Sequence, residues 1–304
     1  MKGRVVKSTG MWYRVLLEDG QWAEARLRGK LKLDDKKITN PIAVGDWVWV
    51  EVAEKGDKVI SSILPRENYV IRASPRKKGH SHLIASNVDQ AVLIASQKSP
   101  RTSLGFIDRF FITLETFRIP GKLIINKSDL YSKEEMEALG TLADLYSSLG
   151  YPTVITSFSA HGARDVADWF TDKTTLLSGH SGTGKSTLIN LLVPDAVQGI
   201  SDISTFADKG VHTTTFAEMF SIDGHSYLID TPGIKELGLA EIEPEELSHY
   251  FTEMRDLLGS CRYHNCLHVN EPGCSIQDAV REGKIALSRF QSYLSMMERD
   301  DNRR

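Results

Sequence analysis

A glycine-rich segment in the second half of the chain constrains the fold more than any other feature. Residues 179–187 read Gly-His-Ser-Gly-Thr-Gly-Lys-Ser-Thr, which has the GxxxxGKS spacing of a phosphate-binding loop. An apolar run over 174–178 precedes this loop, and a helix-like apolar run over 187–193 follows it. Strand, loop and helix in this order aim backbone N–H groups at a phosphate chain. The segment therefore predicts a nucleotide phosphate site in an α/β sheet.

Each member of this loop has an expected role. The glycines let the backbone approach the phosphates because they carry no Cβ. Lys185 is expected to reach the terminal phosphates and to be a catalytic residue, and the Ser186 hydroxyl is expected to hold Mg²⁺. The residues expected to contact the nucleotide here are Gly179, His180, Ser181, Gly182, Thr183, Gly184, Lys185, Ser186 and Thr187.

From residue 87 onward, strand-like and helix-like segments alternate, which indicates a parallel α/β sheet. Strands are expected over 88–96, 122–125, 152–156 and 174–178, and helices over 105–117, 133–149, 163–170 and 187–193. Further on, the segments 216–222 and 226–229 flank Asp223-Gly224, which predicts a β-hairpin.

A second motif follows the expected strand 122–125 and suits a guanine base. Asp129 offers only hydrogen-bond acceptors, which match the ring N–H and the exocyclic amine of guanine. Adenine lacks that amine, so its binding would leave a buried carboxylate unpaired. Asn126 is expected to tie the base loop to the phosphate loop, Lys127 to lie over the base, and the 159–160 backbone to face the guanine oxygen. The residues expected at the base are Asn126, Lys127, Ser128, Asp129, Ser159 and Ala160.

A third motif, Asp230-Thr231-Pro232-Gly233, follows the second hairpin strand. Asp230 is expected to hold Mg²⁺ through water, and the Gly233 N–H is expected to contact the γ-phosphate. A hydroxyl from residues 213–215 should complete the metal shell. Thr214 is the working assignment, with Thr213 and Thr215 as open alternatives. The polar loop over 198–211 is expected to act as a switch segment.

The order of these motifs is unusual, because the base motif at 126 precedes the phosphate loop at 179. The motifs can still surround one nucleotide if the sheet is circularly permuted. On these motifs and their order, the chain resembles the ribosome small-subunit-dependent GTPase A (RsgA) family over essentially its whole length. The resemblance implies a circularly permuted GTPase with an N-terminal OB domain and a C-terminal zinc module.

The water-orienting group is expected to be His212. After Gly233 stands Ile234, where many GTPases carry the glutamine that orients the attacking water, and an apolar side chain cannot do this. His212 lies beside the threonines and could orient water, and the resemblance implies a catalytic histidine here. The alternative is that His212 only caps or packs the switch loop. Val211 stands where the family usually carries arginine, so no role of that arginine is carried over.

The N-terminal third is predicted to be a small β-barrel of the OB type. Strand-like segments cover 3–8, 11–18, 21–27, 46–52 and 58–64, and Asp19-Gly20 signals a hairpin. Residues 1–80 contain 17 Lys and Arg against 10 Asp and Glu, whereas the remainder contains 20 against 30. This asymmetry is typical of a chain in which one module contacts nucleic acid.

Five aromatic residues of this barrel are available for stacking on bases: Trp12, Tyr13, Trp22, Trp47 and Trp49. Because Trp47 and Trp49 alternate on one strand, they should share a face, and we expect at least one of them in the barrel core. The basic segment 66–83 is expected to be a linker, with contact to phosphates as a further expected role.

All three cysteines of the chain lie between 261 and 274, which argues for a metal site rather than disulfides. Cys261, Cys266 and Cys274 with one histidine supply the soft donors of a closed, structural tetrahedral Zn²⁺ site. Both His264 and His268 could be the fourth ligand, and the resemblance favours His268. Helix-like runs over 244–258 and 276–297 flank the site.

These observations predict three domains: an OB-fold RNA-binding domain over 1–67, a circularly permuted α/β P-loop GTPase domain over 68–239, and a helical zinc-binding domain over 240–304. The expected cofactors are GTP or GDP, Mg²⁺ and one structural Zn²⁺. The resemblance implies binding to the small ribosomal subunit and its rRNA during late maturation, with ribosome-stimulated hydrolysis. The alternatives are a large-subunit assembly GTPase and an RNA-binding module that uses GTP as a structural ligand.

The base motif disfavours an ATP-using kinase. Neither a membrane-spanning apolar run nor a signal peptide is recognisable, so we expect a cytoplasmic monomer without a membrane partner.

Overall fold

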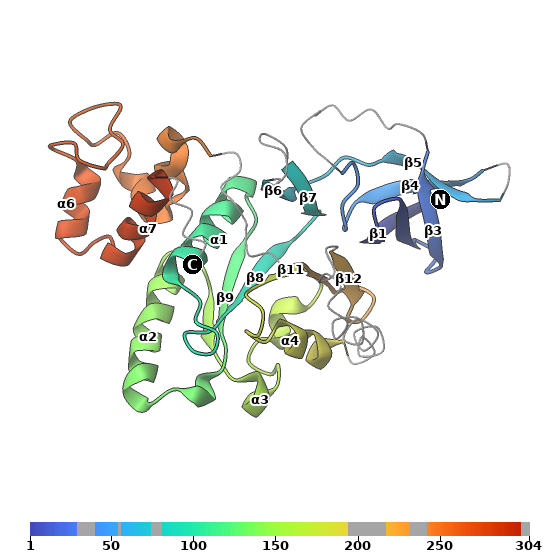
Figure 1. Cartoon of the computed structure of the whole chain (residues 1–304), viewed down its shortest axis with the longest axis horizontal. Coiled ribbons are helices and arrows are strands. Elements are labelled where there is room, and N and C mark those ends of the chain that lie inside the picture. The colour runs from blue at the N-terminus through green and yellow to red at the C-terminus, as the bar shows by residue number, and fades with distance from the viewer. Residues whose placement is uncertain (29–39, 54–55, 74–80, 194–216, 232–241, 299–304) are drawn as a thin grey trace, which may run out of the picture.

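The computed structural model describes residues 1–28, 40–53, 56–73, 81–193, 217–231 and 242–298. An N-terminal barrel, a central sheet covered by helices and a C-terminal helical module follow one another along the chain (Figure 1). Among the described residues, every helix is too short or too polar to span a lipid bilayer.

The N-terminal barrel consists of five strands, as the sequence predicts. They are β1 (Lys2–Ser8), β2 (Trp12–Leu17), β3 (Trp22–Leu27), β4 (Trp47–Val52) and β5 (Lys58–Ile63). Their order is β1-β2-β3-β5-β4, and an additional β1–β4 pairing closes the barrel. The interior is filled by alternate residues of these strands, among them Val15, Val48 and Ile60.

The prediction that Trp47 or Trp49 enters the barrel core is wrong. The two tryptophans do share a face of β4, but that face points outward: Trp49 is 46% exposed and Trp47 is half-buried beneath Lys2. Val48 and Val50 occupy the inner face instead. The physical reason is size, because a narrow five-stranded barrel accepts valine where indole rings would overpack it. Tyr13 is the stacking candidate that lies in the core, at 3% exposure.

The central sheet has the strand order β10-β9-β8-β11-β13-β12. Its strands are β8 (Gln90–Ala95), β9 (Gly121–Ile125), β10 (Thr153–Ile155), β11 (Thr174–Ser178), β12 (Glu218–Ser221) and β13 (Tyr227–Asp230). All neighbours are parallel except the β12–β13 hairpin. Strand β11, which leads into the phosphate loop, comes late in the chain yet lies in the middle of the sheet. A circular permutation requires this arrangement.

Helices cover both faces of this sheet (Figure 1). Helices α1 (Leu104–Phe117) and α2 (Lys133–Ser148) pack on one face, where Phe110 and Phe111 join the core. Helices α3 (Phe158–His161) and α4 (Lys185–Leu192) pack on the other face. Both long helices begin at serine caps, and Ser132 forms a full capping box with Glu135.

Two predicted segments of the central region differ from expectation. The expected linker 66–83 contains a hairpin of β6 (Tyr69–Ala73) and β7 (Ser81–Ser86). The helix expected over 163–170 is only a 3-10 turn, η2 (Ala167–Phe170). One physical reason is that the Thr156 hydroxyl donates to the carboxylate of Asp165 at 2.5 Å, which anchors this segment to the end of β10.

The C-terminal module is helical but more broken than expected. The run 244–258 forms two 3-10 helices, η4 (Pro244–Tyr250) and η5 (Thr252–Leu257), rather than one α-helix. The run 276–297 divides into α6 (Ser275–Arg281) and α7 (Leu287–Met297) at Gly283, whose φ of +73° ends α6. The module packs on α1, because Ile112 belongs to its hydrophobic core.

Candidate active site

The base motif and the phosphate loop meet through Asn126. This residue follows β9, and its side-chain amide donates to the backbone oxygen of Thr183 in the phosphate loop at 2.8 Å. Its side-chain oxygen accepts the N–H of Phe158 at 3.0 Å, so one side chain joins three loops at the carboxyl ends of β9, β10 and β11. A Cβ on Gly184 would lie 2.3 Å from the Asn126 nitrogen, so the junction requires glycine there.

The phosphate loop has the local geometry that its sequence predicts. Gly184 has φ of +115° and precedes α4, which begins at Lys185. The Lys185 ammonium donates to the carbonyls of Gly179 at 2.6 Å and His180 at 3.1 Å. Burial lowers the pKa of Lys185, and the nearby charge of Asp230 opposes that shift. Ser181, Gly182, Ser186 and Thr187 are exposed around this loop, whereas Thr183 is buried beneath it.

The Asp129 carboxylate is exposed and held in place by a residue that the sequence analysis missed. Ser157 donates its hydroxyl to Asp129 and lies 2.9 Å from the Ser159 hydroxyl. The Ser157 hydrogen bond is the main cause that lowers the pKa of Asp129 below its usual value, so the carboxylate stays ionised. The signal available in the sequence was a hydroxyl at the end of an apolar strand, two residues before Ser159.

The remaining predicted base residues lie around this carboxylate. Lys127 has a left-handed backbone conformation and donates its ammonium to the Ser99 carbonyl. Ser128 begins a short 3-10 turn, η1 (Ser128–Leu130). Ser159 and Ala160 are exposed in the first turn of α3, whose start at Phe158 is fixed by Asn126.

Asp230 ends β13 beside the phosphate loop and has the properties of a cation ligand. Among the described residues its buried Oδ1 atom has no hydrogen-bond partner. Burial raises the pKa of Asp230, and the charge of Lys185 counteracts the rise. An unpartnered carboxylate oxygen near a phosphate loop fits Mg²⁺, a hard cation that prefers oxygen ligands. Ser186 would offer its hydroxyl from the start of α4. His212, Thr213, Thr214, Thr215 and Gly233 lie outside the described residues.

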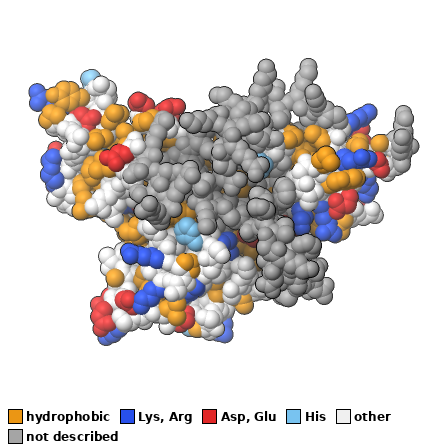
Figure 2. Space-filling view, in the orientation of Figure 1, with side chains coloured by type: hydrophobic (Ala, Val, Ile, Leu, Met, Phe, Trp, Pro, Cys, Tyr) orange, Lys and Arg blue, Asp and Glu red, His pale blue; other side chains and the backbone are white. Residues whose placement is uncertain are grey.

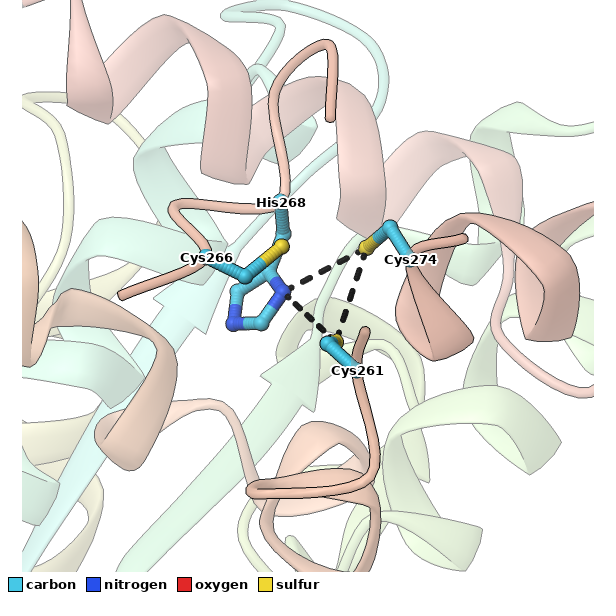
Figure 3. A group of neighbouring side chains, drawn as sticks. All are labelled: Cys261, Cys266, His268 and Cys274. Carbon is cyan, nitrogen blue, oxygen red and sulfur yellow. Dashed lines mark hydrogen bonds between the residues drawn. The ribbon is translucent and has the colours of Figure 1, made fainter. Parts of the chain in front are cut away.

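The predicted zinc ligands converge in the C-terminal module (Figure 3). The ligand atoms of Cys261, Cys266, His268 and Cys274 all lie within 4.8 Å of one another. His268 Nδ1 lies 3.5 Å from Cys261 Sγ and 3.4 Å from Cys274 Sγ, and the two sulfurs are 3.9 Å apart. A tetrahedron with Zn–S bonds of about 2.3 Å has edges of about 3.8 Å, so the cluster fits a closed zinc site.

The alternative ligand His264 is exposed and outside this cluster. Hydrogen bonds from two residues, Glu271 and Tyr293, hold the loop that carries His268. Glu271 accepts the N–H groups of Leu267 and Val269 at 2.8 Å, and the Tyr293 hydroxyl of α7 donates to the Leu267 carbonyl. These contacts hold the imidazole in a buried position.

Comparison with known proteins gives the family. The model of the RsgA GTPase matches residues 63–240, and the model of the RsgA N-terminal domain matches residues 2–60. The chain belongs to the RsgA GTPase family. It is therefore a GTP hydrolase.

Relatives extend over the full chain. A protein of Cytophaga hutchinsonii, named small ribosomal subunit biogenesis GTPase RsgA, is 50% identical, with all of both chains covered. A protein of the same name from Bacteroides fragilis is 45% identical over 98% of this chain and 96% of its own length.

Two solved structures are similar. YjeQ from Thermotoga maritima has a TM-score of 0.76 at 33% identity, covering 100% of this chain and 99% of its own. YloQ, described as a circularly permuted GTPase, has a TM-score of 0.73 at 28% identity, covering 100% and 96%. The RsgA fold expected from the motif order is thus confirmed.

Proposed function

We propose that this RsgA-family GTPase binds the small ribosomal subunit and assists its late maturation, with GTP turnover that the subunit stimulates. The contact between Asn126 and Thr183 carries the GTPase part of the proposal, since it brings the base motif to the phosphate loop. Relatives that are named for small ribosomal subunit biogenesis support the choice of partner.

Within this site, the proposed roles follow the contacts. Asp129 reads the guanine ring N–H and amine while Ser157 holds the carboxylate, and residues 159–160 face the guanine oxygen. Lys185 and the N–H groups of residues 179–187 bind the phosphates. Ser186 and Thr214 would hold Mg²⁺ with their hydroxyls and Asp230 would hold it through water, and the ion would neutralise phosphate charge. His212 orients the attacking water, and Gly233 contacts the γ-phosphate.

The barrel offers a surface suited to RNA on its β2–β3 hairpin. Trp12 and Trp22 are 42% and 51% exposed, and each ring lies beside an arginine: Arg26 is 4.8 Å from the Trp12 ring, and Arg14 is 4.6 Å from the Trp22 ring. Figure 2 shows Lys and Arg side chains interspersed with hydrophobic ones at the right, over this barrel. Indole rings stack on bases and arginines contact phosphates, so we assign rRNA binding to this hairpin.

We further propose three functional domains with the boundaries 1–67, 68–239 and 240–304. One Zn²⁺ per chain would stabilise the last domain, which is too small to fold readily without such a cross-link. GTP would order the switch segment and favour docking on the subunit, and hydrolysis to GDP would favour release. The protein would act as a monomer in the cytoplasm, where its ribosomal partner is assembled.

The experiment that tests this function is GTP turnover titrated with purified ribosomal subunits. Strong stimulation by small subunits supports the proposal. Stimulation by large subunits alone favours the large-subunit alternative. Binding of RNA and GTP without stimulation by either subunit favours an RNA-binding module that uses GTP as a structural ligand.

A further inference from the structure

The barrel and the GTPase sheet are joined edge to edge. Strand β1 of the barrel pairs antiparallel with β12, so the two sheets form one continuous sheet of 11 strands. A register shift between Val5 and Lys7 aids this junction. Val5 points into the barrel core, whereas Val6 packs in the core of the GTPase sheet. The irregular strand thus serves both cores, and the position of Lys7 relative to β12 is well defined.

Three charged residues stand in one row across this junction. Lys7 of β1 is directly opposite Glu218 of β12, and Glu218 is directly opposite Asp230 of β13. Directly opposite residues of antiparallel strands have side chains on the same face, with Cβ atoms about 5 Å apart. The row therefore consists of one cation followed by two carboxylates, and its last residue is Asp230, the carboxylate proposed for Mg²⁺.

The first two residues of this row form an ion pair. The Lys7 ammonium donates to both carboxylate oxygens of Glu218, at 3.0 and 2.9 Å. The side chains are 34% and 26% exposed, so solvent screens this pair only in part. With Glu218 in place, the Lys7 ammonium binds the Glu218 carboxylate, and the buried Oδ1 of Asp230 has no hydrogen-bond partner among the described residues.

We propose that Glu218 is a positioning residue for the magnesium carboxylate: it holds Lys7 of the barrel and thereby keeps Asp230 free to bind Mg²⁺. The proposal rests on the role of Asp230 given under the proposed function. It links the barrel to the hydrolysis site, since any displacement of β1 against β12 changes the charge that Asp230 experiences. RNA that binds the barrel and displaces β1 would therefore change Mg²⁺ binding at Asp230.

The test measures how the release of a fluorescent GDP depends on Mg²⁺ concentration. Glu218→Gln leaves Lys7 without its partner beside Asp230, so the half-maximal Mg²⁺ concentration should rise about fivefold or more. Lys7→Met leaves the negative charge of Glu218 without its partner and should not raise the half-maximal Mg²⁺ concentration. The double variant should return to within about twofold of the wild type, since both charges are gone. Lys7→Arg, which keeps the charge, should behave like the wild type.

A matched control lies on the same strand. Lys2 of β1 pairs with Glu18 at 2.8 Å, far from β12 in the register, so Glu18→Gln removes a similar ion pair without affecting the metal. An unchanged Mg²⁺ dependence in Glu218→Gln would overturn the proposal. It would also be overturned if the double variant were as impaired as Glu218→Gln, because Lys7 would then not be responsible.

Failure of this inference can be told from failure of the proposed site. Asp230→Asn should greatly weaken the Mg²⁺ dependence of GDP release if Asp230 serves the metal. If Asp230→Asn changes the Mg²⁺ dependence of GDP release and Glu218→Gln does not, only the role of Glu218 is wrong. If Asp230→Asn leaves it unchanged, the metal assignment itself is wrong. Thermal unfolding of every variant verifies that the fold is retained.

Discussion

The side-chain amide of Asn126 lies 2.8 Å from the backbone oxygen of Thr183, although the two residues are 57 positions apart and in the reverse of the usual order. This hydrogen bond shows how a permuted chain brings the two motifs together. The loops proposed to read the base and the phosphates need only to meet in space, and strands β9 and β11 bring them to the same edge of the sheet.

Gly184→Ala should disrupt this junction. The new Cβ would lie 2.3 Å from the Asn126 side-chain nitrogen, and the φ of +115° at this position is strained for alanine. We expect a loss of GDP affinity of about five- to thirtyfold, which is what about 1–2 kcal/mol of strain predicts. Equilibrium binding of fluorescent GDP measures this loss of affinity.

Gly140→Ala is the control for that variant. Gly140 lies within α2, and a Cβ there meets nothing within 4 Å. Alanine in a helix interior should raise stability slightly and leave GDP affinity unchanged. Equal affinities of the two variants would argue against the close contact at Asn126.

Asp129→Asn should change the base that the site prefers. An amide can donate to the xanthine oxygen but cannot accept both guanine hydrogens, so GTP affinity should fall and xanthosine triphosphate affinity should rise. Competition between the two nucleotides gives the ratio, which should shift about a hundredfold or more. Retention of the wild-type preference would remove Asp129 from base recognition.

His212→Ala should slow GTP turnover about a hundredfold while GTP affinity changes less than twofold, because a water-orienting group acts mainly in the transition state. Single-turnover hydrolysis and equilibrium binding separate the two quantities. His225→Ala, at the exposed turn between β12 and β13, is the control and should change neither turnover nor GTP affinity. Turnover at the wild-type rate would leave His212 a packing residue.

His268→Ala should remove the zinc ion and loosen the C-terminal module. The imidazole Nδ1 completes a donor set whose spacing fits one tetrahedral ion. Metal analysis should find about one zinc per wild-type chain and much less in the variant. His264→Ala should retain its zinc, since His264 lies outside the cluster. Zinc loss in His264→Ala alone would reverse the ligand assignment.

Arg289→Met should destabilise the contact between the C-terminal module and α1. Arg289 is fully buried and donates to Asp108 of α1 and Glu253 of η5, each at 2.7 Å. Removing one partner leaves buried carboxylates unpaired, which costs about 3–5 kcal/mol. Thermal unfolding should show a large decrease in Tm.

Arg281→Met is the matched control for this buried pair. Arg281 pairs with Asp278 on the exposed face of α6, where screening by solvent makes an ion pair worth about 0–1 kcal/mol. Its Tm should stay close to that of the wild type. Similar unfolding of both variants would mean that the buried network contributes little to the assembly.

Much of this structure follows from local sequence patterns. The barrel strands were predictable because apolar residues alternate with polar ones between clear turns, as in β3 from Ala23 to Leu27. The contact of the base motif with the phosphate loop and the convergence of the cysteines with His268 were predictable, because these residues occur in motifs with the spacing of known ligand sites. The permuted order of the motifs then indicated the family.

Other features depend on tertiary context and were not predictable. Alternation on β4 gives two faces, but only the width of the barrel decides that valines and not tryptophans point inward. The 3-10 helices η4 and η5 carry the apolar pattern of an α-helix, and packing selects their tighter geometry. The position of Ser157 at the end of an apolar strand is only a weak signal, and its role follows from the contact of its hydroxyl with Asp129 in the folded chain. The pair of Lys7 with Glu218 joins residues 211 positions apart.

The most direct test of the nucleotide site is an experimental structure of the protein with Mg²⁺ and a non-hydrolysable GTP analogue. We predict that the guanine ring contacts Asp129, that the phosphates lie in the loop 179–187, and that one molecule bridges both segments beside Asn126. A nucleotide whose base lies away from residues 126–129, or two separate ligands at the two segments, would contradict it.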